Sequence, residues 1–186
     1  MASGKQYEVL SVQDQIKRIS QWTVEILLLM FLALSLTHLF GTRVRMEGNS
    51  MTPTLAGEDR MLLNRLKGKV ISIQRYDIIV YQLPGQEGVF LKRVLGLPGE
   101  TLQISGGEIL INGRIIPESE YTRFLSYAGV AAEPVELGEG EFFVVGENPD
   151  ASLDSRFTDV GNISIQDILG TVWLRFSPFK DIRFFN

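Results

Sequence analysis

Ser50 stands in the stretch GNSMTPTL, residues 48–55, where its hydroxyl could act as a nucleophile. A serine hydroxyl attacks a carbonyl efficiently only when a neighbouring base removes its proton. The chain has no cysteine and only one histidine, His38, near the end of a long apolar run. A Ser-His-Asp triad would need a histidine at membrane depth, and a three-histidine metal site is impossible. The composition therefore favours lysine as the base, and no metal or cofactor is expected.

Four lysines follow the apolar run: Lys67, Lys69, Lys92 and Lys180. The first two flank a glycine in a polar turn and are expected to be solvated, and the last lies in the C-terminal tail. Lys92 differs because strand alternation in VFLKRVLGL, residues 89–97, puts it on one face with Phe90 and Val94. Burial among apolar neighbours lowers the pKa of an amine, so Lys92 could supply the neutral base. The alternative is a lysine whose stem covers the strand while its ammonium stays in water.

From Trp22 to Phe40 the chain reads WTVEILLLMFLALSLTHLF, and residues 26–42 carry no charged side chain. A helix of about 20 residues crosses the hydrocarbon core, so the sequence predicts an N-terminal segment at 1–21 and a transmembrane anchor at 22–40. A cleaved signal peptide is less favoured because LTHLFGTR offers no A-x-A pattern, and a buried core helix is the other alternative. Basic residues are nearly balanced on the two sides, so charge alone does not set the orientation.

After Gly41 the chain changes to short β-like runs separated by turn signals. Strands are expected at 60–66, 77–83, 89–97, 101–105, 108–111 and 141–146. The pairs Gly106-Gly107 and Asn112-Gly113 predict tight hairpin turns and thus a meander from Thr101 to Ile116. Residues 117–140 are expected to form a long loop or extended hairpin, and 164–168 a short helix or turn. GTVWLRFSP predicts a last strand that ends at Pro178. The expected fold class is mainly β and partly barrel-like.

Four motifs follow the apolar run in a fixed order: GNSMTPTL, RYDIIVY, FLKRVLGLPGE and GENPDASLDSR. In this combination the chain resembles type I signal peptidase over about residues 43–178. The resemblance implies a signal-peptidase-like β ectodomain at 41–186 on an N-terminal transmembrane helix. It also implies a serine endopeptidase that removes signal peptides from exported preproteins after small residues, at A-x-A type sites, with a Ser/Lys dyad.

The same resemblance assigns roles to single residues. Ser50 would be the nucleophile and Lys92 the general base. Ser152 matches the serine that hydrogen-bonds and orients the lysine amine, and Asp154 and Arg156 match the pair that braces the site. In some members a serine two positions before the nucleophile helps to stabilise the oxyanion. Because Gly48 stands there in this chain, as in other members, backbone N–H groups would have to supply the oxyanion hole.

Four further residues match positions near the small apolar substrate pockets of the family: Met51, Leu55, Phe90 and Leu91. Ordinary core packing is an equally good explanation for each of them. The implied partners are signal peptides and the lipid bilayer. The implied location is a bacterial plasma membrane or a thylakoid membrane, with one span, a cytoplasmic N-terminus and the catalytic domain on the translocated side.

Two other classes of protein compete with this interpretation. A self-cleaving repressor-type Ser/Lys peptidase has a related fold, but it is soluble and carries a DNA-binding module. A membrane-tethered β module could bind a partner without catalysis. The net charge of −4 gives no basic surface for nucleic acid, which is not expected as a partner. The C-terminal FSPFKDIRFFN has four phenylalanines, which either pack on the β domain or contact the bilayer surface.

Overall fold

The computed structural model describes residues 11–117, 127–148 and 151–185. It divides into two units, residues 1–38 and 39–186, and the second is called the β unit below. The first contains most of a single long helix, α1 (Val12–Phe40). Ser11 precedes this helix, and its hydroxyl accepts a hydrogen bond from the Asp14 N–H at 3.2 Å and donates one to the Asp14 carboxylate at 2.6 Å. This capping satisfies a free N–H in the first helical turn, so α1 begins ten residues before the predicted anchor.

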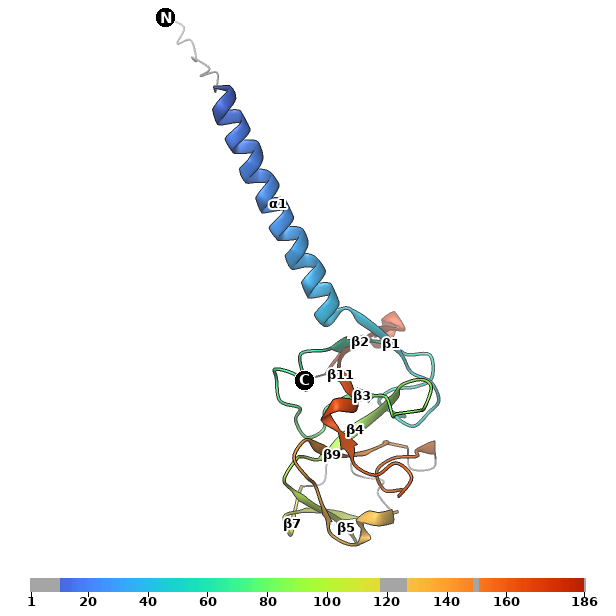
Figure 1. Cartoon of the computed structure of the whole chain (residues 1–186). Helices are drawn as coiled ribbons and strands as arrows, with labels where there is room; N and C mark the ends of the chain where they lie inside the picture. Colours follow the sequence, from blue (N-terminus) through green and yellow to red (C-terminus); the bar gives the residue numbers. More distant parts are fainter. Residues whose placement is uncertain (1–10, 118–126, 149–150, 186) are drawn as a thin grey trace, which may run out of the picture. The chain divides into compact units, whose positions relative to one another are not determined.

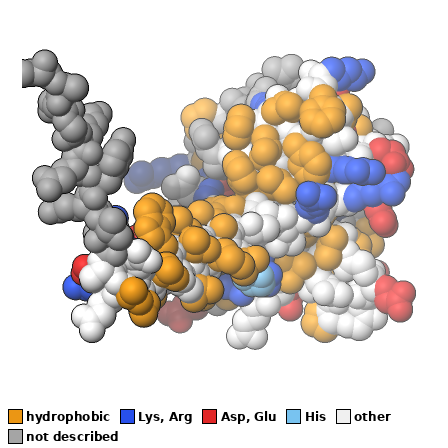
Figure 2. Space-filling view, turned by 90° about the horizontal axis from the view of Figure 1, so that it is seen from above, with side chains coloured by type: hydrophobic (Ala, Val, Ile, Leu, Met, Phe, Trp, Pro, Cys, Tyr) orange, Lys and Arg blue, Asp and Glu red, His pale blue; other side chains and the backbone are white. Residues whose placement is uncertain are grey.

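Apolar side chains cover all sides of α1 along its middle part, where the large ones between Ile26 and Leu36 are 49–71% exposed within the structure (Figure 2). A helix that is hydrophobic all round is suited to a protein core or to a membrane. None of the described residues of α1 is buried, and its 29 residues are long and apolar enough to cross a bilayer. At about 1.5 Å per residue, this length exceeds the roughly 30 Å of the hydrocarbon core.

The β unit is built from antiparallel strands and short 3₁₀ turns (Figure 1). Its larger sheet contains β1 (Thr42–Arg45), β2 (Arg60–Asn64), β11 (Ile168–Ser177), β3 (Ile78–Tyr81), β4 (Phe90–Gly96), β9 (Glu141–Val145) and β10 (Ile163–Ser164) in this order, with β12 (Arg183–Phe184) paired to β11. The smaller sheet has the order β7 (Arg114–Ile115), β6 (Glu108–Ile111), β5 (Thr101–Ser105), β8 (Val135–Glu136). The 3₁₀ turns are η1 (Gly129–Ala132), η3 (Ile165–Asp167) and η4 (Phe179–Asp181).

Alternation along the central strands divides the core between the two faces of the larger sheet. On β3, Ile78 and Val80 belong to one buried cluster, whereas Ile79 and Tyr81 belong to another. Because successive strand residues point to opposite faces, this arrangement follows from the sequence pattern. Both faces are covered, so all four residues of β3 are buried.

Three buried clusters result. Cluster 1 contains Leu95, Leu102, Ile104, Ile109, Ile111, Ala131, Leu137, Phe143 and Val145. Cluster 2 contains Met46, Met51, Leu55, Met61, Leu63, Ile78, Val80, Leu91 and Val172. Cluster 3 contains Ile73, Ile79, Tyr81, Val94, Phe142, Val144, Ile163 and Ile168. Strand β9 supplies cluster 1 with Phe143 and Val145 and cluster 3 with Phe142 and Val144, so it links the two sheets.

The expected class, a mainly β and partly barrel-like domain behind an apolar helix, is confirmed. All six predicted strands are present, and the meander through the turns at Gly106-Gly107 and Asn112-Gly113 forms as expected. The segment 164–168 contains η3, with Ser164 as its cap. Within the predicted loop 117–140, residues 118–126 lie outside the described residues, and the rest contains η1 and β8.

One boundary prediction was wrong. The strand that ends at Ser177 is not the last, because the chain turns after Pro178 and returns as β12. Leu174 and Arg175 of β11 pair with Phe184 and Arg183 of β12. The proline correctly marked the end of a strand, since it has no N–H for the ladder. It gave no information on whether the chain would pair again after the turn.

Candidate active site

Ser50 lies in the loop between β1 and β2, which is closed at its base by backbone hydrogen bonds. The Met46 N–H donates to the Asp59 carbonyl at 2.9 Å, and the Glu58 N–H donates to the Met46 carbonyl at 3.2 Å. Met51 and Leu55 follow the serine and are fully buried in cluster 2. The core therefore holds the loop, while Ser50 itself stays half-buried at its tip.

Gly48 lies two residues before Ser50, and its φ is +74°. Left-handed backbone of this kind strongly favours glycine, because a Cβ is strained there. The glycine thus suits the turn that leads into Ser50. The N–H of Ser50 donates to no acceptor among the described residues, so it remains available to an incoming ligand.

Lys92 lies on β4, between β3 and β9, and is only 4% exposed. Its neighbours Phe90 and Val94 point to the same face and pack in cluster 3, as the alternation predicted. Among the described residues, the Lys92 amine forms no ion pair and no hydrogen bond. It is therefore not hydrogen-bonded to the Ser50 hydroxyl in this structure. A lysine that snorkels into water is excluded by this burial, so the alternative of a solvated ammonium was wrong.

Three segments that are distant in sequence meet at Gly146. The register that pairs Arg93 with Val145 continues to place Lys92 opposite Gly146. A Cβ on this glycine would lie 2.2 Å from the Ser152 Oγ and 2.7 Å from the Ser50 carbonyl oxygen. Residues directly opposite in an antiparallel pair project to the same face. Ser152 and the Ser50 backbone therefore occupy the space that a side chain at 146 would fill, and Lys92 projects to the same side of the sheet.

Backbone contacts hold this meeting point. The N–H of Asn148 donates to the Ser50 carbonyl at 3.0 Å, which ties the serine loop to the segment after β9. The Gly146 N–H donates to the Asp154 carboxylate at 2.9 Å. The first tie joins two main-chain groups, and the second joins a main-chain N–H to a carboxylate, so together they fix the backbone at residues 50 and 146.

Asp154 and Arg156 form a fully buried ion pair, as predicted. Two parallel hydrogen bonds of 2.8 Å join the guanidinium Nε and Nη2 to the two carboxylate oxygens. The Ser152 hydroxyl donates to the same carboxylate at 2.6 Å. Ser152 is thus oriented by Asp154 in this structure, and its predicted hydrogen bond with the Lys92 amine stays a prediction.

The electrostatics of the pair act on Lys92. Burial lowers the pKa of Lys92 from 10.5 to about 8, while the negative charge of Asp154 raises it and the positive charge of Arg156 lowers it. For Asp154, burial would raise the pKa, but the hydrogen bonds from Arg156, Gly146 and Ser152 together keep it below its usual value. With a pKa near 8, roughly a tenth of the Lys92 amines are neutral at pH 7. For an ordinary lysine, fewer than about one amine in a thousand is neutral at this pH.

The residue next to Lys92 braces the strand. Arg93 is buried and forms an ion pair with Glu147, and its Nη1 donates to the Tyr76 carbonyl at 2.6 Å.

Lys67 was expected to be solvated, and this expectation was wrong. Its amine donates to both carboxylate oxygens of Asp77, at 2.9 and 3.0 Å. Its turn lies close enough to β3 for an ion pair to form, and this proximity is a tertiary property.

The four predicted substrate-pocket residues are placed differently from one another. Met51 and Leu55 have no accessible surface, and Leu91 is 4% exposed, so these three are core residues of cluster 2. Phe90 is half-buried and stacks on Tyr81, with ring centroids 5.6 Å apart. A substrate could touch Met51 or Leu55 only after neighbouring side chains move. Their role in a substrate pocket stays a prediction.

Sequence reasoning missed Arg175 on β11. Its Nη1 donates to the Thr54 carbonyl at 3.0 Å and to the Asp59 carboxylate at 3.1 Å, so it holds the loop that carries Ser50. The local sequence around Arg175 does not indicate that its partners, Thr54 and Asp59, lie more than 100 positions away. Gly146 belongs to the motif GENPDASLDSR, but the sequence did not reveal that Ser152 and the Ser50 carbonyl both lie against it.

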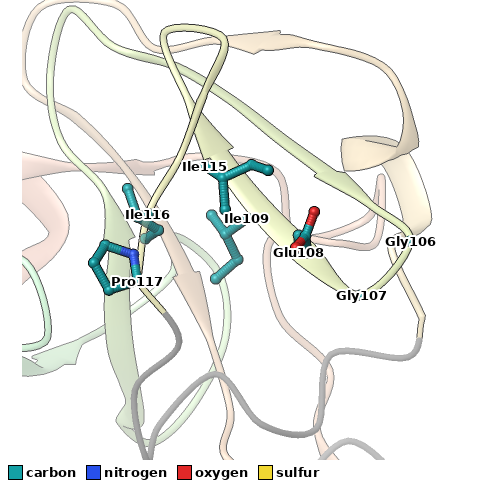
Figure 3. A pocket seen from close by; sticks show the side chains of 7 residues that line it. All are labelled: Gly106, Gly107, Glu108, Ile109, Ile115, Ile116 and Pro117. Atoms are coloured by element: carbon teal, nitrogen blue, oxygen red, sulfur yellow. The ribbon is translucent and has the colours of Figure 1, made fainter.

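A cavity of about 300 Å³ lies at the hairpin of the smaller sheet, where Ile109, Ile115 and Ile116 line it (Figure 3). Among the described residues that line it, Glu108 is the one with an ionisable side chain, and none is a serine, lysine or histidine. A second cavity, of about 480 Å³, follows the edge strand β1 and includes Glu47, three residues before Ser50. Among the described residues, no cluster of His, Asp and Glu could hold a metal ion.

Comparison with known proteins identifies the family of the chain. The family model of the signal peptidases, peptidase S26, matches residues 19–177. Signal peptidase I T of Bacillus subtilis strain 168 is 31% identical over 170 residues, which cover 88% of each chain. Signal peptidase I of Bacillus licheniformis is 32% identical and covers 88% of this chain and 91% of that protein. Signal peptidase I of Leptolyngbya laminosa is 36% identical over 69% of this chain and 65% of its own.

Among solved structures, a signal peptidase I from Enterococcus faecalis V583 is 29% identical, with a TM-score of 0.45, and covers 54% of this chain and 96% of that one. The family model and the relatives decide the family: the chain belongs to the signal peptidases of the peptidase S26 family. It is therefore a peptidase enzyme whose class removes signal peptides. The apolar helix α1 and the bacterial relatives fit an enzyme anchored in a membrane.

Gly146→Ala tests the meeting point. The added methyl group would collide with Ser152 and with the Ser50 backbone, so both must shift, and we expect kcat/KM on a signal-peptide substrate to fall by at least about tenfold. Gly138→Ala is the control, because its Cβ would come no closer than 3.4 Å to any atom and Gly138 has no positive φ. Wild-type activity in the Gly146 variant would contradict the close approach.

Lys92→Met tests the burial of the amine. A charged lysine in this place destabilises the folded state below pH 8, by about 3 kcal/mol for a pKa lowered from 10.5 to about 8. The methionine variant should therefore unfold at higher urea than the wild type at pH 7, as followed by circular dichroism of the full chain in detergent. The difference should shrink as pH rises above about 8 and vanish well above 10.5, where the wild-type amine is neutral in both states. Lys69→Met, at an exposed site, should change little, and equal stability of Lys92→Met and wild type at pH 7 would show that the amine is hydrated.

Proposed function

We propose that the protein is a membrane-anchored serine endopeptidase that removes signal peptides with Ser50 as nucleophile and Lys92 as general base. The observation that carries the proposal is an almost fully buried lysine, opposite a glycine around which the Ser50 backbone and Ser152 converge. Burial favours the neutral form of the Lys92 amine, and the loop presents the Ser50 hydroxyl at its half-buried tip. No other lysine of the described β unit is both buried and without an ion pair: Lys67 pairs with Asp77, and Lys69 and Lys180 are exposed.

The chemistry proceeds by acyl transfer. Neutral Lys92 accepts the proton of Ser50 as Oγ attacks the scissile carbonyl carbon, and it then protonates the leaving amine. In the second half, the lysine accepts a proton from water, which attacks the acyl-enzyme and releases the signal-peptide carboxylate. Ser152, held by Asp154, orients the amine during both halves. The unoccupied N–H of Ser50 is a candidate donor to the oxyanion, and a good donor contributes about 3–4 kcal/mol to the transition state.

The substrate is proposed to bind as an extended strand along the edge of the larger sheet. Strand β1 is an edge strand that leads directly into the Ser50 loop. The cavity beside it is lined by apolar side chains from Val44, Leu63, Val89 and Leu169 and by the charged residues Arg43, Arg45, Glu47 and Arg65. Strand addition at an edge provides backbone hydrogen bonds, while alternate side chains enter shallow pockets. This mode suits cleavage after small residues at −1 and −3, because these two positions project to the same face.

Anchoring explains how enzyme and substrate meet. A signal peptide and α1 in one bilayer are confined to the same thin layer, and this raises their effective concentration. The proposed topology has a cytoplasmic N-terminus and the β unit on the translocated side of a bacterial plasma or thylakoid membrane. The expected domains are the N-terminal segment 1–21, the anchor 22–40 and the peptidase domain 41–186. Proteolysis of the β unit from the cytoplasmic face alone would contradict this topology.

Ser50→Ala and Lys92→Ala should each abolish cleavage of a preprotein with an A-x-A site, because each removes one partner of the proton transfer. The expected loss in kcat is at least about 10³-fold, measured with purified full-length protein in detergent. Circular dichroism should show an unchanged fold. Processing by the Lys92→Ala protein at the wild-type rate would eliminate the dyad, and no cleavage by the wild type would favour a binding module without catalysis.

The pH dependence follows from the lowered pKa of Lys92. Only the neutral amine is a base, so kcat/KM should rise about tenfold per pH unit at acidic pH and level off above about pH 8. The profile should be measured from pH 5.5 to 10 with a synthetic signal peptide. A rise that continues to pH 10 without levelling off would mean that the amine keeps the pKa of a solvated lysine.

A further inference from the structure

The groove beside the edge strand β1 is lined by the two segments that lead to the proposed dyad. Its cavity of about 480 Å³ is lined by β1 and by Gly88 and Val89, which come directly before β4. Strand β1 continues into the loop that carries Ser50, and Lys92 follows Val89 by three positions. An extended chain bound in this groove is therefore led toward both the nucleophile and the base.

The groove is basic, although the protein as a whole is acidic. Among the described residues that line it, three are arginines, Arg43, Arg45 and Arg65, and Glu47 is the one acidic residue. The chain itself carries a net charge of −4. A cleft lined mainly by one sign of charge attracts ligands of the opposite sign. The local excess of positive charge therefore indicates a ligand with negative charge along at least part of its length.

Two of these arginines project from the same face of β1. Strand alternation leaves Arg43 and Arg45 exposed, whereas Val44 between them packs against cluster 2. In the register of the two strands, Arg45 lies opposite Arg60 of β2, and the ion pair of Arg45 with Glu58 offsets one of these two charges. Like charges directly opposite each other destabilise a sheet. Stability of the sheet therefore does not account for the basic residues of this edge.

Arg43 is the arginine of the groove that is best placed to bind a ligand. Among the described residues, its exposed guanidinium forms no ion pair and no hydrogen bond. The guanidinium of Arg45, in contrast, is already paired with Glu58. A charge-assisted hydrogen bond from Arg43 to a carboxylate would therefore break no contact of the protein.

The direction of a bound chain follows from the position of the end of α1. The Arg65 N–H donates to the carbonyl of Leu39, in the last turn of α1, at 3.0 Å, and β1 begins two residues after the helix. The groove therefore runs from the helix end to the Ser50 loop. With the proposed anchoring, the apolar part of a signal peptide lies in the bilayer at the helix end. The groove then receives the residues that come before the cleavage site.

We propose that this groove selects signal peptides by charge, and that Arg43 favours an acidic side chain and disfavours a basic one upstream of position −3. The inference rests on the proposed function, because it takes Ser50 and Lys92 as the centre of cleavage. Strand β1 ends at Arg45, five positions before Ser50, so substrate residues −4 to −6 are the ones expected beside the strand. Pairs of exposed opposite charges attract each other only modestly, and the expected effect is about threefold.

The test uses synthetic signal peptides with alanine at −1 and −3 that carry glutamate, glutamine or lysine at −4, −5 or −6. With the full-length protein in an uncharged detergent, glutamate at one or more of these positions should raise kcat/KM at least about threefold over glutamine, and lysine should lower it by a similar factor. The change should lie in KM rather than in kcat, because the contact is remote from the scissile bond. Salt at about 1 M should remove most of the difference by screening the charges.

Substitutions of Arg43 identify the residue that selects. Arg43→Gln should bring the ratio of kcat/KM for the glutamate and glutamine peptides close to one. Arg43→Glu should invert the order, so that the lysine peptide is cleaved best. Arg114→Gln and Arg114→Glu are the matched controls, because Arg114 is an exposed arginine on β7, an edge strand of the smaller sheet. Both control variants should keep the wild-type order of the peptides.

The outcomes separate this inference from the proposed function. Equal cleavage of all the peptides by the wild type keeps the proposed function and overturns selection by charge, and an anionic lipid headgroup would then be the better ligand for Arg43. A wild-type order of the peptides in both Arg43 variants overturns the role of this residue. If the wild type cleaves none of the peptides, the proposed function fails and the inference fails with it.

Discussion

The removal of one amine from water is the constraint on which the site depends. Lys92 occupies a central strand whose neighbours on both sides are paired, so its side chain has no route to bulk solvent along the sheet. Desolvation lowers the pKa of the amine, and the ion pair of Asp154 and Arg156 places compensating charges near it. The two charges act in opposite directions, so burial remains the dominant cause. The same burial makes the folded state less stable, which is a usual compromise in active sites.

Around this amine, the molecule relies on main-chain geometry. Gly146 lacks the side chain that would separate Ser50 from Ser152, and the backbone groups of residues 146 and 148 hold the two loops together. Arg175 secures the serine loop from the opposite direction, through Thr54 and Asp59. Because these ties join the serine loop to the segment after β9 and to β11, the site depends on the order of the strands in the sheet. The serine loop could not keep its position without cluster 2, in which Met51 and Leu55 are buried.

The aromatic residues near the end of α1 form a second theme. The ring of Trp173 contacts those of Phe40 and Phe184, although residues 40 and 184 are far apart in sequence. Of the C-terminal phenylalanines, Phe185 packs on the core, while Phe179 and Phe184 are exposed. Packing on the β domain, the first alternative that the sequence left open, therefore holds for Phe185.

The sequence by itself determined the strands, the hairpin turns, the apolar helix and the apolar neighbours of Lys92 on its strand, because alternation, turn residues and hydrophobic length are local properties. The motifs also determined the family, and with it the buried pair of Asp154 and Arg156. Only the tertiary structure decided that Lys67 binds Asp77, that Met51 and Leu55 are core residues, that the chain returns as β12 and that Gly146 is the meeting point. Each of these depends on which strands lie side by side. Strand order is set by the summed packing of the whole sheet, and no short window of sequence contains it.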